Sequence, residues 1–147
     1  MNIDHIGIVV KNIAKGIDHW KDVFGYSQKT GVVINTRQKV KVVFMKKENS
    51  ITIKLTEPID ETSPIYAFAK KGGGLHHLCF KCDNIENQLE EFAAKRIRVL
   101  TPPLPGEAFD NENIAFVYAG QGLNIELIDT DKKADRKSTR LNSSHRL

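Results

Sequence analysis

The chain has 147 residues, a formal net charge of +4 and an apolar fraction of 40%. This length fits one domain of ordinary size with a hydrophobic core. No apolar run approaches the roughly 18 residues that a membrane-spanning helix needs, and no charged and apolar leader precedes the first predicted strand. We therefore expect a cytoplasmic protein that has no membrane partner.

The basic charge is concentrated at the C-terminal end. Residues 135–147 carry four basic side chains against one acid, a net +3, which leaves +1 for residues 1–134. The charge therefore does not indicate a nucleic-acid partner. The end of the chain is polar and without periodicity, so we expect residues 131–147 to be a disordered tail. Residues 135–147 also resemble a translated sequencing adapter, which makes them a candidate artefact; the alternative is a genuine basic tail.

A pattern at the N-terminus recurs 72 residues later. Asp4-His5-Ile6-Gly7-Ile8 matches residues 74–80, with the sequence GLHHLCF. In both stretches large apolar residues alternate with a histidine and then a small residue, as on the two faces of a strand. The same shift without a gap gives identical residues at six positions, which are those of His5, Asn12, Ile13, Phe44, Ile53 and Leu55. We interpret the chain as two copies of one unit, about 2–58 and 74–130, joined by a linker at 59–73.

Each copy predicts the order strand, helix and three strands. In the first copy we expect strands at 2–10, 28–35, 40–45 and 51–56, and a helix at 13–24. The linker contains a short helix at 63–70 and three consecutive glycines. In the second copy we expect strands at 75–82, 98–100, 113–118 and 123–129, a helix at 85–95 and a proline-rich loop at 101–110. The fold class is therefore α+β, with two tandem βαβββ modules in one domain of residues 1–130.

Four polar residues stand in otherwise apolar strands: His5, Lys54, His77 and Glu126. The 72-residue shift relates Lys54 to Glu126 as it relates His5 to His77. If a pseudo-twofold axis relates the copies, these side chains meet in a shared cleft. Two imidazoles and a carboxylate could then hold a divalent metal ion. The alternatives are two hydrogen-bonded core histidines and a buried salt bridge between Lys54 and Glu126.

At these motifs, residues 1–130 resemble the vicinal oxygen chelate superfamily, and most of all its methylmalonyl-CoA epimerase-like and glyoxalase I-like members. The residues that carry the resemblance are Asp4-His5-Ile6-Gly7-Ile8, Ser63-Pro64-Ile65, Gly74-Leu75-His76-His77-Leu78 and Ile125-Glu126-Leu127. The resemblance implies a half-open barrel around a central cleft, with His5, His77 and Glu126 as ligands of one divalent ion (Co, Ni, Zn, Mn or Fe). It also implies a small anionic or acyl-CoA-like substrate and a homodimer.

Lys54 departs from the family pattern, which places a Glu or Gln ligand at that position. A protonated lysine has no lone pair to donate and repels a divalent ion at close range. Three outcomes are open. A metal binds through three ligands, or the Lys54 ammonium replaces the cation and binds an anionic ligand without metal, or the protein is a non-catalytic binding module.

The resemblance implies an isomerase or lyase that abstracts a proton beside a carbonyl group. Glu126 is the candidate base, and the metal or Lys54 would hold the enolate. Related epimerases place a second glutamate on the third strand, where this chain has Lys41, Val42 and Val43. The alternatives are a metal-free ligand-binding protein and an iron dioxygenase, because two histidines and one carboxylate also form the facial triad of such enzymes.

Overall fold

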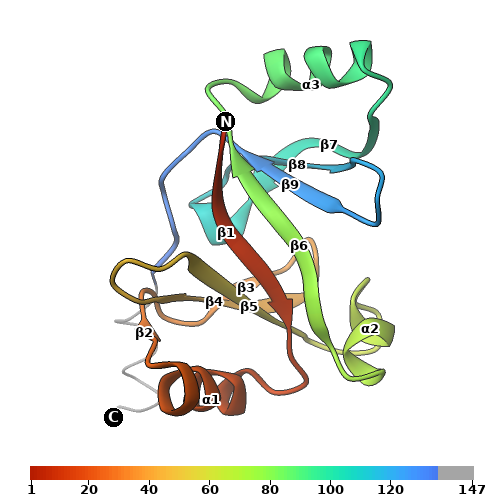
Figure 1. Ribbon diagram of the computed structural model, residues 1–147. Coiled ribbons are helices and arrows are strands. Elements are labelled where there is room, and N and C mark those ends of the chain that lie inside the picture. The colour runs from red at the N-terminus through yellow and green to blue at the C-terminus, as the bar shows by residue number, and fades with distance from the viewer. Residues whose placement is uncertain (136–147) are drawn as a thin grey trace.

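The computed structural model describes residues 1–135 and has the predicted α+β fold of two βαβββ modules (Figure 1). The first module contains β1 (Asn2–Val9), α1 (Ile13–Phe24), β2 (Ser27–Gln28), β3 (Val33–Asn35), β4 (Val40–Lys46) and β5 (Thr52–Pro58). The single strand expected at 28–35 is divided into β2 and β3, which both pair with β4. The short helix α2 (Tyr66–Lys70) lies in the linker. The second module contains β6 (Gly74–Lys81), α3 (Ile85–Ala94), β7 (Arg98–Gly106), the 3-10 turn η1 (Glu107–Phe109), β8 (Glu112–Tyr118) and β9 (Asn124–Ile128).

The strand order shows the internal symmetry that the repeat predicts. The strands form one mixed sheet in the order β2-β4-β5-β1-β6-β9-β8-β7, with β3 paired to β4. In each module the first strand runs parallel to the last, β1 beside β5 and β6 beside β9. The two modules meet where β1 pairs antiparallel with β6, and Figure 1 shows these strands side by side at the centre. The sheet is not closed into a barrel, because it ends at β2 and β7.

Three hydrophobic clusters hold the sheet and helices together. One packs α1, through Ile13 and Ile17, onto the strands of the first module. A second packs α3, through Ile85, onto the second module. The third combines residues of both modules: Val40, Val42, Phe44, Cys79, Ala108, Phe109, Ile114 and Ile128. Alternation along β1 sends Ile6 and Ile8 to the α1 cluster, and leaves His5 and Gly7 on the opposite face, toward this shared core.

The proline-rich segment of the second module differs from the expected loop. The strand predicted at 98–100 continues as β7 through Gly106 and includes Pro102, Pro103 and Pro105. It pairs with β8 across two register shifts. β7 lies at the edge of the sheet and has a neighbouring strand on one side only, a position at which prolines are tolerated.

The segment after β9 packs against the domain instead of starting a tail. The backbone N–H of Ala134, which is 1% exposed, donates to Ala108 O at 2.8 Å. Lys133 pairs with Asp4, and the backbone N–H of Gly31 donates to Asp135 Oδ1 at 3.0 Å. The prediction of disorder from residue 131 onward is therefore wrong for residues 131–134, because an apolar side chain and a lysine of this short segment become buried. Residues 136–147, with most of the suspected adapter sequence, lie outside the described part of the chain.

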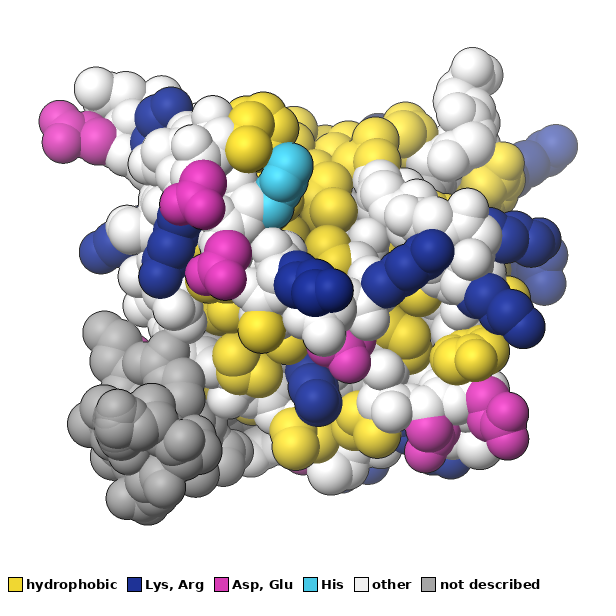
Figure 2. All heavy atoms as spheres, turned by 90° about the horizontal axis from the view of Figure 1, so that it is seen from below, with side chains coloured by type: hydrophobic (Ala, Val, Ile, Leu, Met, Phe, Trp, Pro, Cys, Tyr) yellow, Lys and Arg dark blue, Asp and Glu magenta, His cyan; other side chains and the backbone are white. Residues whose placement is uncertain are grey.

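Figure 2 shows one face of the molecule, on which Lys and Arg side chains are spread among acidic and hydrophobic ones instead of forming a single patch. Among residues 1–135, each helix is too short or too polar to cross a lipid bilayer.

Candidate active site

His5 reaches the site from the middle of β1 and is fully buried. Its Nε2 lies 3.0 Å from Glu126 Oε1, and its Nδ1 lies 2.7 Å from Asp4 Oδ2. The imidazole ring packs against Phe44 and Phe109, with ring centroids 5.3 and 6.0 Å away. The aromatic contacts and the two carboxylates together fix the ring in one orientation.

His77 reaches the site through an irregularity in β6. Gly7 of β1 is paired with His77, but Ile8 is paired with Leu75, so His76 is an extra residue that forms a β-bulge. His76 Nδ1 and His77 Nδ1 lie 2.9 Å apart, where one nitrogen donates and the other accepts. A Cβ atom at residue 7 would overlap the His77 imidazole, so a glycine at this position lets the ring lie across β1.

Glu126 on β9 is the point at which the predicted site residues meet. Its Oε1 lies 3.0 Å from His5 Nε2 and 3.1 Å from His77 Nε2. Lys54 Nζ, from β5, lies 3.3 Å from Oε2 and 3.4 Å from Oε1. The structure therefore brings together all four polar residues that the sequence singles out.

The electrostatics of the site favour an ionised Glu126 and a neutral His77. Burial by itself would raise the pKa of Glu126, but the charge of Lys54 and the hydrogen bonds from His5 and His77 hold this pKa well below its usual range. Burial lowers the pKa of His77 to about 4, although Glu126 opposes this shift. Burial, and then the charge of Lys54, also lower the pKa of His76. Near neutral pH, His77 thus keeps a nitrogen lone pair available.

The donor atoms fit a divalent metal through three ligands. The ligand atoms of His5, His77 and Glu126 lie within 4.8 Å of one another. Both imidazoles have a partner at Nδ1, Asp4 for His5 and His76 for His77, which is how metal-binding histidines are oriented in proteins. Lys54 stands where a fourth ligand is expected, and its ammonium group offers no lone pair. The residues therefore fit a metal held by three protein ligands and not by four.

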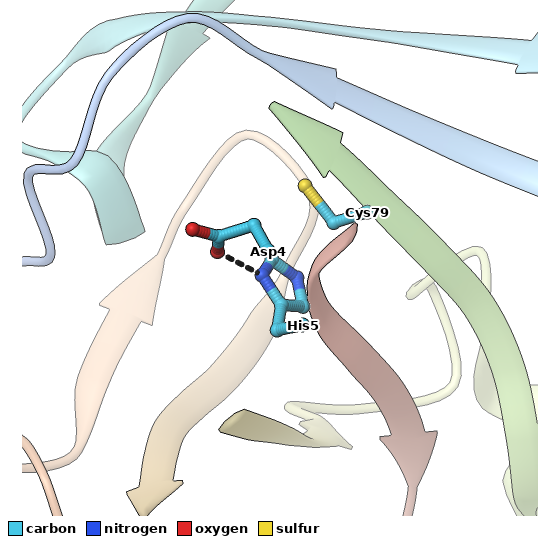
Figure 3. Close-up of side chains that lie close together, drawn as sticks. All are labelled: Asp4, His5 and Cys79. Carbon is cyan, nitrogen blue, oxygen red and sulfur yellow. Dashed lines mark hydrogen bonds and ion pairs between the residues drawn. The ribbon is translucent and has the colours of Figure 1, made fainter. Parts of the chain in front are cut away.

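Asp4, His5 and Cys79 form a second group of possible ligand atoms (Figure 3). This group shares His5 with the first, and Lys133 Nζ already lies 3.2 Å from Asp4 Oδ2. Burial, and then the charge of Glu126, raise the pKa of Cys79, so the thiol stays protonated. These three facts make the group a poor independent metal site.

Two adjoining cavities lead to the site. The larger, of about 450 Å³, is lined by Asn35, Arg37, Gln38, Pro64, Ile65, His76, Leu100, Thr101, Leu104, Pro105, Ile114, Phe116 and Asn124. A smaller one of about 30 Å³ shares Asn35, Gln38, Ile65, His76 and Phe116 with it and reaches Lys54 and His77. Thr56 also lines the small cavity, and its buried hydroxyl has no hydrogen-bond partner among residues 1–135. His5 and Glu126 line neither cavity and lie behind Lys54 and His77.

Sequence reasoning did not assign His76, Thr56 or Arg37 to the cavity walls. The adjacent histidines at 76 and 77 are a visible signal in the sequence. However, strict strand alternation sends neighbouring side chains to opposite faces, and only the bulge brings both rings to one side.

The sequence and the fold are matched by known proteins. Residues 4–116 match the model of the glyoxalase/bleomycin resistance protein/dioxygenase superfamily. The chain therefore belongs to this superfamily, as the sequence motifs predicted.

Several of the proteins that the chain is similar to are named methylmalonyl-CoA epimerases. A mitochondrial methylmalonyl-CoA epimerase of Dictyostelium discoideum is 29% identical over 133 residues, which cover 89% of this chain and 78% of the relative. An uncharacterized Bacillus subtilis protein, YqjC, is 30% identical over 130 residues, which cover 86% of this chain and 91% of YqjC. A solved methylmalonyl-CoA epimerase in complex with methylmalonyl-CoA and NH4+ superposes with a TM-score of 0.77 over 91% of this chain and 97% of its own. At 24% identity, this last likeness concerns the fold alone.

The close approach of His77 to Gly7 predicts a specific coupling. We expect Gly7→Ala to lower the free energy of unfolding by about 1–3 kcal/mol, because the new methyl group must displace the imidazole. In a His77→Ala background the same change should cost much less. Urea unfolding of the four proteins measures this coupling, and equal costs in both backgrounds would show that the ring does not lie across residue 7.

The pKa of His77 predicts how stability depends on pH in the metal-free protein. Its folded-state value is about 4 and its ordinary value 6.5, so between these pH values the unfolded chain binds a proton that the folded chain does not. This group should therefore make the protein less stable as the pH falls from 7 to 4, by about 3 kcal/mol. Denaturant unfolding of wild type and His77→Gln at several pH values, in the presence of a chelator, tests this. If the free energy of unfolding depends on pH equally in both proteins, the prediction is contradicted.

Proposed function

We propose that the chain is an isomerase that moves a proton at the carbon beside the carbonyl group of a small acyl-CoA or similar anionic substrate. The observation that carries this proposal is the convergence of two imidazoles on one oxygen of Glu126, at 3.0 and 3.1 Å, behind a cavity of ligand size. The names of the epimerase relatives support the same class of reaction.

In this proposal His5, His77 and Glu126 hold one divalent ion, with Co, Ni, Zn, Mn and Fe as candidates. When bound, the ion would polarise the substrate carbonyl and stabilise the negative charge of the enolate. The hydrogen bonds at the Nδ1 atoms keep the imidazole Nε2 atoms directed at Glu126. The substrate itself would approach through the larger cavity.

Glu126 is our candidate for the group that accepts the substrate proton, and its two oxygens have different surroundings. Oε1 faces both imidazoles, whereas Oε2 lies 3.3 Å from Lys54 Nζ. Lys54 lines the small cavity, so Oε2 is the oxygen that a substrate carbon could reach if Lys54 moved. Removal of the lysine charge would also raise the basicity of Glu126, because that charge is the main cause that lowers its pKa.

The cavity walls suit a short acyl group that carries an anionic substituent. Most of the lining residues are apolar, and among residues 1–135 the larger cavity is lined by one Lys or Arg side chain, that of Arg37. The Thr56 hydroxyl and the Lys54 ammonium would serve a polar group at the inner end. The solved epimerase bound methylmalonyl-CoA, which is a substrate of this kind.

One observation favours a second candidate function, a metal-free site for an anionic ligand. Lys54 pairs with both oxygens of Glu126 and balances its charge without any metal. The solved epimerase complex contains an ammonium ion together with methylmalonyl-CoA. In this candidate function, the tethered ammonium group of Lys54 would hold the substrate oxygen directly. An iron dioxygenase, which the same two-histidine, one-carboxylate set would allow, stays a prediction.

Metal analysis of wild type and Lys54→Gln separates the two candidates. If the metal-dependent isomerase is correct, wild type binds one ion per chain, and Lys54→Gln binds it at least about tenfold more tightly because a like charge is removed. If Lys54 replaces the metal, wild type binds none and the variant gains one. Lys46→Gln, which changes an exposed lysine, is the matched control and should behave as wild type. An ion in neither protein would contradict the metal site.

Exchange of the substrate α-proton tests the chemistry. We expect wild type to exchange the α-proton of methylmalonyl-CoA in D2O, as followed by proton NMR. Glu126→Gln should slow this exchange by about 10²–10⁴-fold, the usual contribution of a general base. Glu90→Gln, on the exposed surface of α3, should leave the rate unchanged. Exchange at the wild-type rate in Glu126→Gln would exclude Glu126 as the base.

A further inference from the structure

The segment after β9 contains a buried lysine that the proposed reaction does not use. The side chain of Lys133 is 6% exposed, although it lies only five residues after the end of β9. Its Nζ lies 3.2 Å from Asp4 Oδ2 and 3.3 Å from Asp4 Oδ1. It also lies 5.5 and 5.4 Å from the ring centroids of Phe44 and Phe109. A lysine loses its hydration when it is buried, so such contacts require a specific arrangement of partners.

The contacts of Lys133 continue directly to a site histidine. Asp4 Oδ2, which Lys133 contacts, also lies 2.7 Å from His5 Nδ1. The Asp4 carboxylate thus lies between the ammonium group of Lys133 and the imidazole of His5. A carboxylate paired with a lysine can only accept a hydrogen bond, so the contact with Asp4 requires a proton on His5 Nδ1. Nε2 is then the nitrogen that faces Glu126, and it is the atom that would bind a metal ion.

The surroundings of His5 are therefore nearly symmetrical. On the Nε2 side a carboxylate, Glu126, is balanced by Lys54. On the Nδ1 side a carboxylate, Asp4, is balanced by Lys133. Lys54 Nζ and Lys133 Nζ lie 5.3 and 5.4 Å from the centroid of the Phe109 ring, which is stacked on His5.

We propose that Lys133 is a positioning residue for the site. It holds Asp4 in the orientation that fixes the His5 ring, with Nδ1 bonded to Asp4 and Nε2 directed at Glu126. The segment that carries Lys133 is anchored by the backbone hydrogen bond of Ala134 to Ala108 and by that of Gly31 to Asp135. Through these contacts, the segment after β9 of the second module supplies a partner for Asp4, and Asp4 in turn orients His5 of the first module.

The test compares Lys133→Met with Lys133→Arg, which keeps the charge, and with Lys132→Met as the matched control. Lys132 is 62% exposed, and its nearest carboxylate, that of Glu112, is 3.9 Å away. Calorimetric titration of the full-length proteins with Co²⁺ should show affinity about 10–100-fold weaker for Lys133→Met, the usual effect of losing a partner behind a ligand. Lys133→Arg should recover most of the affinity, and Lys132→Met should match wild type. In an Asp4→Asn background, Lys133→Met should have little further effect.

Equal Co²⁺ affinity of wild type and Lys133→Met would overturn the proposal, even if the variant is less stable. The metal titration rests on the proposed function, so a second measurement is made without metal. The ¹⁵N chemical shifts of the His5 ring should show a proton at Nδ1 in wild type and in Lys132→Met, and a loss of this preference in Lys133→Met. If wild type binds no Co²⁺ but the His5 shifts change as expected, the metal proposal fails and the role of Lys133 stands. Unchanged shifts in Lys133→Met would overturn that role.

Discussion

The structure depends on a carboxylate that is entirely withdrawn from water. Transfer of an isolated carboxylate into a protein interior costs several kcal/mol even after the surroundings relax, so Glu126 requires compensating partners. Lys54 and His5 come from the first module and His77 from the second. The two modules must therefore pack against each other before the charge of Glu126 is compensated. The pairing of β1 with β6 provides this, because it places His5 and His77 on neighbouring strands at the centre of the sheet.

Much of this arrangement could be predicted from the sequence, because a repeat with a constant shift specifies positions as well as elements. The match of His5 to His77, and of Lys54 to Glu126, identified the four polar residues that now surround one carboxylate. The helix at 13–24 was predicted at its observed bounds, since an Asn side chain begins it and Gly25 ends it in the left-handed conformation. The helix ends depend on neighbouring residues and the site residues on the internal repeat, so both can be predicted from the sequence alone.

The features that were missed depend on long-range packing. The β-bulge at His76 comes from a register shift between two strands that are far apart in sequence, so strict alternation, which sends His76 and His77 to opposite faces, does not predict it. Lys133 stands in a short polar stretch that resembles a tail, and its burial depends on Asp4, 129 residues away. The prolines of β7 predicted a loop, but an edge strand tolerates them. In each case a tertiary contact overrode a correct local preference.

The charges around His5 give the site its chemical character. Two carboxylates and two lysines surround a pair of imidazoles, so the site can be neutral overall without a metal, and a divalent ion must compete with Lys54 for Glu126. The low pKa of His77 and the partners at both Nδ1 atoms favour the ion, whereas the Lys54 ammonium opposes it. The relative strength of these effects decides whether the substrate oxygen meets a metal or a lysine.

The most direct test of the central claim is a crystal structure of the protein grown with Co²⁺, with anomalous scattering recorded at the cobalt edge. The account predicts His5 and His77 with their Nε2 atoms directed at the Glu126 carboxylate, and an anomalous peak at coordination distance from all three residues. Imidazole rings that point away from each other, or a Glu126 side chain turned toward solvent, would contradict the site itself.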